Sequence, residues 1–122
     1  MHIRVENLGQ TAGKKAILRG IDLEFDPGMV HAILGPNGAG KSTLLRLLGL
    51  LDKPGQGEIY YDGQRLGAMP RALRTRLRRR CGFVFQLPLL LAGTVEDNLR
   101  FGPRLRGLKV GLAEQHDFAF GT

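Results

Sequence analysis

Nine consecutive residues carry the clearest chemical signal in this sequence. They fit the pattern G-x-x-x-x-G-K-[ST], in which glycines, a lysine and a hydroxyl residue keep a fixed spacing. Glycines lack side chains, so the backbone can curl until several N–H groups point at one anion. The lysine can reach the terminal phosphates of a nucleotide, and the hydroxyl that follows it can bind Mg²⁺. These residues are Gly35, Pro36, Asn37, Gly38, Ala39, Gly40, Lys41, Ser42 and Thr43.

The residues on either side of this loop predict the elements that position it. Val30–Leu34 is a nearly continuous apolar run, which is typical of a strand buried on both faces. After the loop, leucines fill most positions from 44 to 51, and they predict a helix that is apolar nearly all round and therefore buried. A plain glycine-rich turn is the alternative. This setting favours a phosphate site instead, because a helix N-terminus attracts anions.

Composition excludes several classes of protein. No apolar run reaches the length of a membrane span, and the first residues lack the apolar segment of a signal peptide. We therefore expect neither a membrane-spanning helix nor a signal peptide. The single cysteine, Cys81, excludes an internal disulfide framework and indicates a reducing compartment, where we expect a buried structural thiol. The net charge of +7 owes much to a cluster of arginines without aromatic residues between them. These predict a solvated helix face rather than a nucleic-acid site; they are Arg71, Arg74, Arg76, Arg78, Arg79 and Arg80.

Alternating patterns predict further strands. Residues 3–5 alternate apolar and charged side chains, and Ile21–Phe25 alternates apolar and acidic ones. The polar stretch Gly9–Lys15 between them predicts a loop. Glu58–Tyr61 and Gly82–Phe85 predict two more strands.

Two helices are expected after the strands. Pro70 lies in the first turn of one of them, whose apolar stripe is narrow. Thr94 can cap the other, with acidic residues in its first turn. Between the two helices, Leu87–Leu91 is an unusually apolar loop, and Leu108–Thr122 shows no regular period.

Taken together, these motifs resemble the first half of the ATP-binding subunit of an ABC transporter. The glycine loop matches the sequence of the Walker A motif in that family. Val84–Gln86 resembles its Q-loop, and Gly93–Leu99 resembles the segment that opens its helical subdomain. The resemblance implies an α/β fold of the P-loop NTPase class. It would be a partial ABC-type nucleotide-binding domain, with parallel core strands, an antiparallel β subdomain and the start of the helical subdomain. We expect this partial domain over 1–107, and a non-native or disordered tail over 108–122.

The resemblance also implies ligands and partners. Gly35–Thr43 would bind ATP, Ser42 and Gln86 would bind Mg²⁺, and Gln86 would serve catalysis. The segment Gln86–Leu91 would contact a membrane-spanning subunit, and a second ATP-binding subunit would complete a dimer; no nucleic acid is expected. Such a subunit lies in the cytoplasm against the inner face of the membrane. The motif sequences are similar to those of ATPases from bacterial importers. The more specific prediction is an importer of an oxyanion such as phosphate or tungstate.

Three departures from the family pattern leave hydrolysis by this chain open. The Walker B strand with its catalytic glutamate and the signature motif are both missing, and Ala12 stands where the family has an aromatic residue that stacks on adenine. We therefore expect a truncated or frameshifted product that binds nucleotide. A non-functional fragment, a small P-loop kinase and a basic nucleic-acid-binding module are the alternatives.

Overall fold

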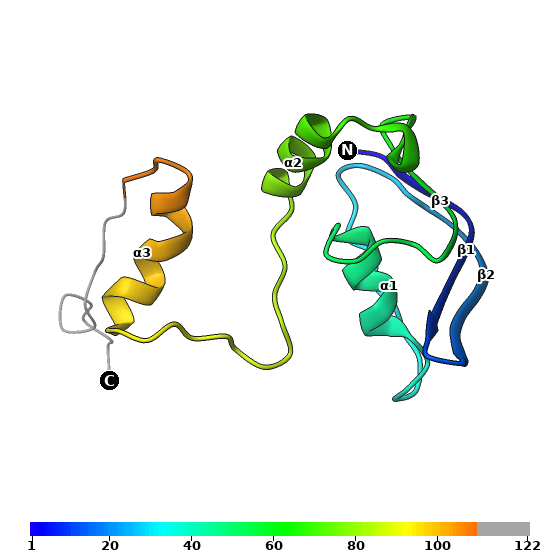
Figure 1. Cartoon of the computed structure of the whole chain (residues 1–122), viewed down its shortest axis with the longest axis horizontal. Helices are drawn as coiled ribbons and strands as arrows, with labels where there is room; N and C mark the ends of the chain where they lie inside the picture. The colour runs from blue at the N-terminus through cyan, green and yellow to red at the C-terminus, as the bar shows by residue number, and fades with distance from the viewer. Residues whose placement is uncertain (110–122) are drawn as a thin grey trace. The chain divides into compact units, whose positions relative to one another are not determined.

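The computed structural model describes residues 1–109, and the chain divides into two compact units (Figure 1). The first unit is Met1–Phe83, and the second begins at Val84. The first unit contains β1 (Ile3–Ala12), β2 (Lys15–Phe25), α1 (Lys41–Leu48), β3 (Gln56–Tyr61), β4 (Gln64–Arg65), the short 3₁₀ helix η1 (Leu66–Ala68) and α2 (Arg71–Arg80). The second unit contains α3 (Val95–Leu105). Most of the predicted tail, from residue 110 onward, lies outside the described residues.

The strands form one antiparallel sheet in the order β2-β1-β3-β4, which confirms the antiparallel part of the predicted fold. Val5 in the central strand β1 pairs with Leu23 on one side and with Ile59 on the other. The predicted loop over Gly9–Lys15 is wrong, because β1 and β2 continue through it until Ala12 pairs with Lys15. Polar side chains do not prevent this, since a hairpin end needs only paired backbone groups and can leave its side chains in water.

Helix α1 packs against the sheet through one face only. Leu44 and Leu47 are buried, whereas Leu45 is 45% exposed and Leu51 38% exposed, so the prediction of a helix buried all round is wrong. The helix is also shorter than predicted. It ends at Leu48, and Leu50 has a φ of 59° that reverses the chain. The buried core of the first unit consists of Val5, Leu8, Leu18, Leu44, Leu47, Ile59, Tyr61, Leu66, Met69 and Leu77.

Two predicted strands are irregular in the structure. Val30–Leu34 belongs to no strand of residues 1–109, with Val30 99% and Leu34 89% exposed. Gly82–Phe85 is likewise outside the sheet. An apolar run becomes a strand only when a neighbouring strand satisfies its backbone N–H and C=O groups. The parallel core strands of the predicted fold are therefore not formed within residues 1–109.

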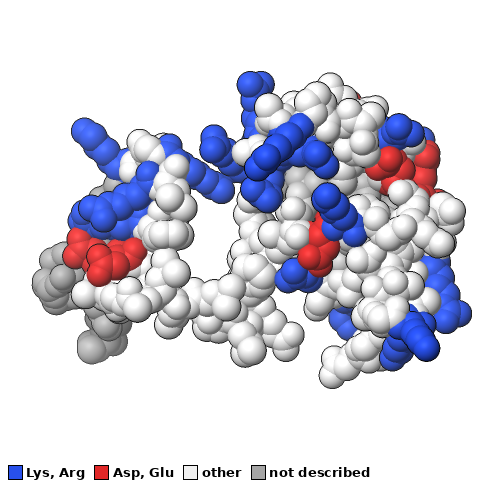
Figure 2. Space-filling view, in the orientation of Figure 1, with Lys and Arg blue, Asp and Glu red and all other residues white. Residues whose placement is uncertain are grey.

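Both predicted helices after the sheet are confirmed. Helix α2 follows Pro70 and buries Leu77, while its arginines are exposed apart from the half-buried Arg74. Lys and Arg side chains gather over this helix in Figure 2. Thr94 caps α3 as predicted, through a reciprocal pair of hydrogen bonds with Asp97. No helix of residues 1–109 is long and apolar enough to span a membrane.

Cys81 follows the last residue of α2 and is partly buried. Its thiol donates to the Leu77 carbonyl over 3.6 Å. Burial raises the pKa of the Cys81 thiol, so the thiolate that would react or bind metal is disfavoured. This agrees with the predicted structural role.

Candidate nucleotide-binding site

The predicted phosphate loop is a tight turn that leads directly into α1. Gly38 and Gly40 have φ angles of 83° and 94°, a region that residues with side chains rarely adopt. The Lys41 ammonium donates hydrogen bonds to the carbonyls of Gly35, at 2.5 Å, and Pro36, at 2.7 Å. The ammonium therefore lies beside the loop backbone, where it can meet a phosphate that the same backbone binds.

Gly40 fixes the loop to the sheet. A Cβ atom at this position would lie 2.8 Å from Leu18 Cδ2 and 3.1 Å from Ile17 Cγ2. Gly40 is thus required both for its left-handed backbone and for its close contact with β2. Through this contact the sheet positions the first turn of α1.

The first turn of α1 offers free backbone donors. Gly40 is its N-cap, no side chain caps it, and no acidic residue lies in its first turn. The first N–H groups of a helix have no partner within the helix, and the helix dipole adds partial positive charge there. With Lys41 as its first residue, this end of α1 is suited to a phosphate group.

Magnesium fits this site only as a companion of phosphate. Within residues 1–109, no group of three or more histidine, cysteine or acidic side chains gathers to hold a metal. Mg²⁺ typically takes one or two protein ligands and completes its shell with phosphate oxygens and water. The Ser42 side chain is exposed on the first turn of α1. Its hydroxyl can supply one such ligand next to a bound phosphate.

The predicted site residues fall in different units. All nine residues of the loop lie together in the first unit, whereas Gln86 lies in the second. Gln86 is exposed at a bend of the chain. Its predicted catalytic and Mg²⁺-binding roles stay predictions.

Sequence reasoning missed two features near the far end of α1. Arg46 Nε donates to Asp52 Oδ2 over 2.6 Å, and a second guanidinium nitrogen donates to Oδ1 over 3.0 Å. This pair raises the pKa of Arg46 and lowers that of Asp52. The other feature is a basic cavity beside α2. Its signal was present in the spacing of Arg71, Arg74 and Arg78, because residues three and four apart share one face of a helix.

Comparison with known proteins shows the family to which the chain belongs. The sequence profile of the family described as "ABC transporter" matches residues 18–120. The chain is 42% identical over 113 residues to ABC transporter I family member 17 of Arabidopsis thaliana, covering 92% of this chain and 42% of that protein. It is 38% identical over 104 residues to a probable anion import ATP-binding protein of Haloferax volcanii, covering 85% of this chain and 36% of that protein. The chain therefore spans less than half the length of these relatives.

Solved structures of one bacterial ABC transporter cassette, MJ0796, share the fold. Its dimeric structure aligns with a TM-score of 0.70 and 31% identity, covering 94% of this chain and 51% of that chain. A post-hydrolysis state of the same cassette bound to ADP and Pi aligns with a TM-score of 0.68 and 30% identity, with the same coverage. The family profile covers most of the chain, and the loop, helix and sheet agree with it. This chain belongs to the ABC transporter family, as part of its ATP-binding cassette.

Proposed function

We propose that this chain binds Mg·ATP through Gly35–Thr43 and forms part of the ATP-binding subunit of a transporter. One observation carries the proposal: the uncapped N-terminus of α1 follows directly on a left-handed glycine turn, with the Lys41 ammonium held beside it. A relative named as an ATP-binding protein and a cassette bound to ADP and Pi support it. Lys41 would bind the terminal phosphates, and Ser42 would bind the Mg²⁺ that accompanies them.

The partners of the family follow as part of the proposal. A second ATP-binding subunit would complete a dimer, as the dimeric MJ0796 cassette supports. A membrane-spanning subunit would contact Gln86–Leu91 and keep the chain at the cytoplasmic face of the membrane. The exposed leucines of this loop support that contact, with Leu87, Leu89 and Leu90 each more than three quarters exposed. Replacing Leu89 and Leu90 by serine should then improve solubility without lowering thermal stability, whereas a lower thermal stability would contradict an exposed docking loop.

The transported substrate and the chemical step belong to the whole protein. The anion import relative supports an oxyanion as substrate. Hydrolysis requires a residue that positions the attacking water and a full Mg²⁺ shell, besides the phosphate clamp. Within this proposal, Lys41 and Ser42 supply the clamp, and the metal-binding role expected of Gln86 stays a prediction.

The test is equilibrium binding of a fluorescent ATP analogue to the 122-residue chain. Lys41→Ala should abolish binding, because it removes the charge that faces the phosphates. Lys109→Ala removes the same charge from an exposed position of the second unit and should leave the affinity unchanged. Ser42→Ala should weaken binding only when Mg²⁺ is present. Unchanged affinity in Lys41→Ala, with circular dichroism matching the parent, would overturn the assignment.

A further inference from the structure

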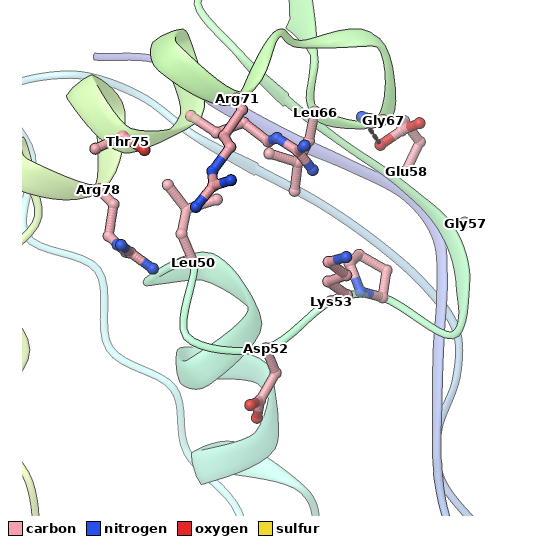
Figure 3. Close-up of a pocket in the computed structure, with 12 residues that line it drawn as sticks. Leu50, Asp52, Lys53, Gly57, Glu58, Leu66, Gly67, Arg71, Thr75 and Arg78 are labelled. Atoms are coloured by element: carbon pink, nitrogen blue, oxygen red, sulfur yellow. Dashed lines mark hydrogen bonds between the residues drawn. The ribbon is translucent and has the colours of Figure 1, made fainter.

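A second site for anions lies in the first unit, away from the phosphate loop. A cavity of 640 Å³ lies between α2, η1, the start of β3 and the chain that follows α1 (Figure 3). Its size falls within the range of roughly 300–1,000 Å³ that is usual for small-molecule sites. Its lining is Leu50, Asp52, Lys53, Pro54, Gly57, Glu58, Leu66, Gly67, Arg71, Arg74, Thr75 and Arg78. No residue of Gly35–Thr43 is among them, so a ligand here would not occupy the nucleotide site.

Arginines of α2 form one wall of this cavity. Arg71, Arg74 and Arg78 are three and four residues apart and therefore share one face of the helix. Figure 3 shows the Arg71 and Arg78 side chains extending from the helix toward the side where Leu50 lies. Within residues 1–109, none of the three guanidinium groups forms a side-chain ion pair or hydrogen bond. Their donors remain available to a ligand.

The two carboxylates of the lining are already engaged elsewhere. Asp52 accepts both hydrogen bonds from Arg46, and its carboxylate points away from Arg71 and Arg78 in Figure 3. The other carboxylate, Glu58, forms an ion pair with Arg65, which does not line the cavity, at 3.6 Å, and accepts hydrogen bonds from the backbone N–H groups of Gly67 and Ile59. These partners satisfy the carboxylates, so the arginines and Lys53 leave the cavity with an excess of positive charge.

We propose that this cavity binds a small soluble molecule carrying two or more phosphate groups. A guanidinium offers a planar fork that binds a phosphate through two parallel hydrogen bonds, whereas an ammonium acts as a compact point charge. Arg71, Arg74 and Arg78 supply the forks, Lys53 supplies the point charge, and the Thr75 hydroxyl adds a neutral donor. A single phosphate would engage only part of this wall, which favours a ligand with several phosphate groups.

Pyrophosphate is the probe, measured by isothermal titration calorimetry in the Lys41→Ala background. That background removes the lysine of the phosphate loop, so the binding that remains reports on the cavity and not on the nucleotide site. We expect one pyrophosphate to bind per Lys41→Ala chain. Arg71→Gln with Arg78→Gln should lower the affinity at least about tenfold, which corresponds to about 1.4 kcal/mol. Arg71→Lys with Arg78→Lys keeps the charge but loses the guanidinium forks. Its affinity for pyrophosphate should lie between that of the Lys41→Ala chain and that of the glutamine double variant.

A matched control separates this site from general attraction to a basic helix. Arg76 and Arg80 are on the same helix but line a smaller cavity with Tyr61 and Leu77 instead. Arg76→Gln with Arg80→Gln removes the same charge from side chains that do not line the cavity. It should lower the affinity by clearly less than the loss of about tenfold expected for Arg71 and Arg78, because no direct hydrogen bond to the ligand is removed. Equal losses in both double variants, or no binding in the Lys41→Ala background, would overturn the proposal. Circular dichroism of each variant must match the parent.

Discussion

The hydroxyl of Tyr61 on β3 donates a hydrogen bond of 2.8 Å to the carbonyl of Leu48, the last residue of α1. Tyr61 is 2% exposed, so its ring packs in the core while its hydroxyl satisfies a helix-end carbonyl. This bond ties the sheet to the far end of the helix that begins at the phosphate loop. The other end of α1 is fixed to β2 through Gly40.

Tyr61→Phe should destabilise the first unit by about 1–3 kcal/mol, because it leaves the partly buried Leu48 carbonyl without its partner. Chemical denaturation at pH 7 measures this loss. Tyr60→Phe is the control. Its ring lies 4.4 Å from the Arg4 guanidinium, and its hydroxyl hydrogen-bonds Glu6 at a half-exposed position where water can replace the lost partner. Removing this hydroxyl should therefore cost less than about 1 kcal/mol of stability. Equal effects of the two changes would contradict the role of the Tyr61 bond.

The same tyrosine predicts a loss of stability in alkali. Burial raises the pKa of Tyr61 well above its usual value. A raised folded-state pKa means that the folded protein holds the proton more tightly than the unfolded chain. The resulting stabilisation is complete below about pH 10 and declines above it. The stability difference between the parent and Tyr61→Phe should therefore narrow above about pH 10. A constant difference from pH 8 to pH 11 would argue against a buried neutral hydroxyl.

Asp52→Asn should lower stability at pH 7 and have less effect in acid. Arg46 holds the pKa of Asp52 below its usual range, so the folded state favours the ionised form. This stabilisation is present above about pH 4, the unfolded value, and is lost as the pH falls through the lower folded value. Urea denaturation from pH 7 to pH 2.5 measures the change. A double-mutant cycle with Arg46→Gln gives the coupling between the two side chains, and strictly additive losses would show that they do not interact.

Gly40→Ala should destabilise the chain more than Gly38→Ala does. Both positions have positive φ angles, so each alanine costs about 1 kcal/mol in backbone strain. Only at Gly40 would the new Cβ also meet Leu18 at 2.8 Å, whereas nothing lies within 4 Å at Gly38. We expect the Gly40 variant to lose further stability through the contact with β2. The melting temperatures of the two variants measure this difference. Equal decreases in melting temperature would mean that the loop can move away from β2.

Nucleotide selectivity should be poor. Ala12 ends β1 and is exposed, so at this position no ring can stack on adenine, a contact worth roughly 1–3 kcal/mol per base. Competition of ATP against GTP for the fluorescent analogue should show less than about a tenfold preference. Ala12→Tyr should increase the preference for ATP. A hundredfold preference in the parent chain would mean that another residue reads the base.

Local patterns predicted the parts of this fold that local forces decide. The glycine spacing around Lys41, the Thr94 cap and the alternation near Leu23 each depend on a few neighbouring residues, and the structure places them as expected. Within the site, the glycine turn and the start of its helix were predictable for the same reason. The contact of Gly40 with Ile17 was not, because no local pattern specifies which distant side chain will meet a glycine.

The errors have one physical cause. Val30–Leu34 has the composition of a buried strand, but strand formation depends on a neighbour elsewhere in the chain. The all-round apolar pattern of α1 likewise predicts burial only where other elements cover each face, and here Leu45 stays exposed. The opposite error occurred at Gly9–Lys15, where polar residues still form a hairpin because their backbones pair.

The irregular path of Val30–Leu34 has a consequence for the energetics of ligand binding. The phosphate loop is anchored at its C-terminal side by α1 and β2, but the segment that enters it is not held in a sheet. Outside a sheet, this segment has fewer backbone hydrogen bonds to hold it. We therefore expect a bound ligand to restrict it further, and fixing each backbone residue costs about 1–2 kcal/mol of conformational entropy. The measured affinity would then be the intrinsic affinity multiplied by the fraction of molecules in which the entry segment is already arranged for binding. Calorimetry of nucleotide binding should accordingly show an unfavourable entropy that shrinks in variants which stiffen residues 30–34.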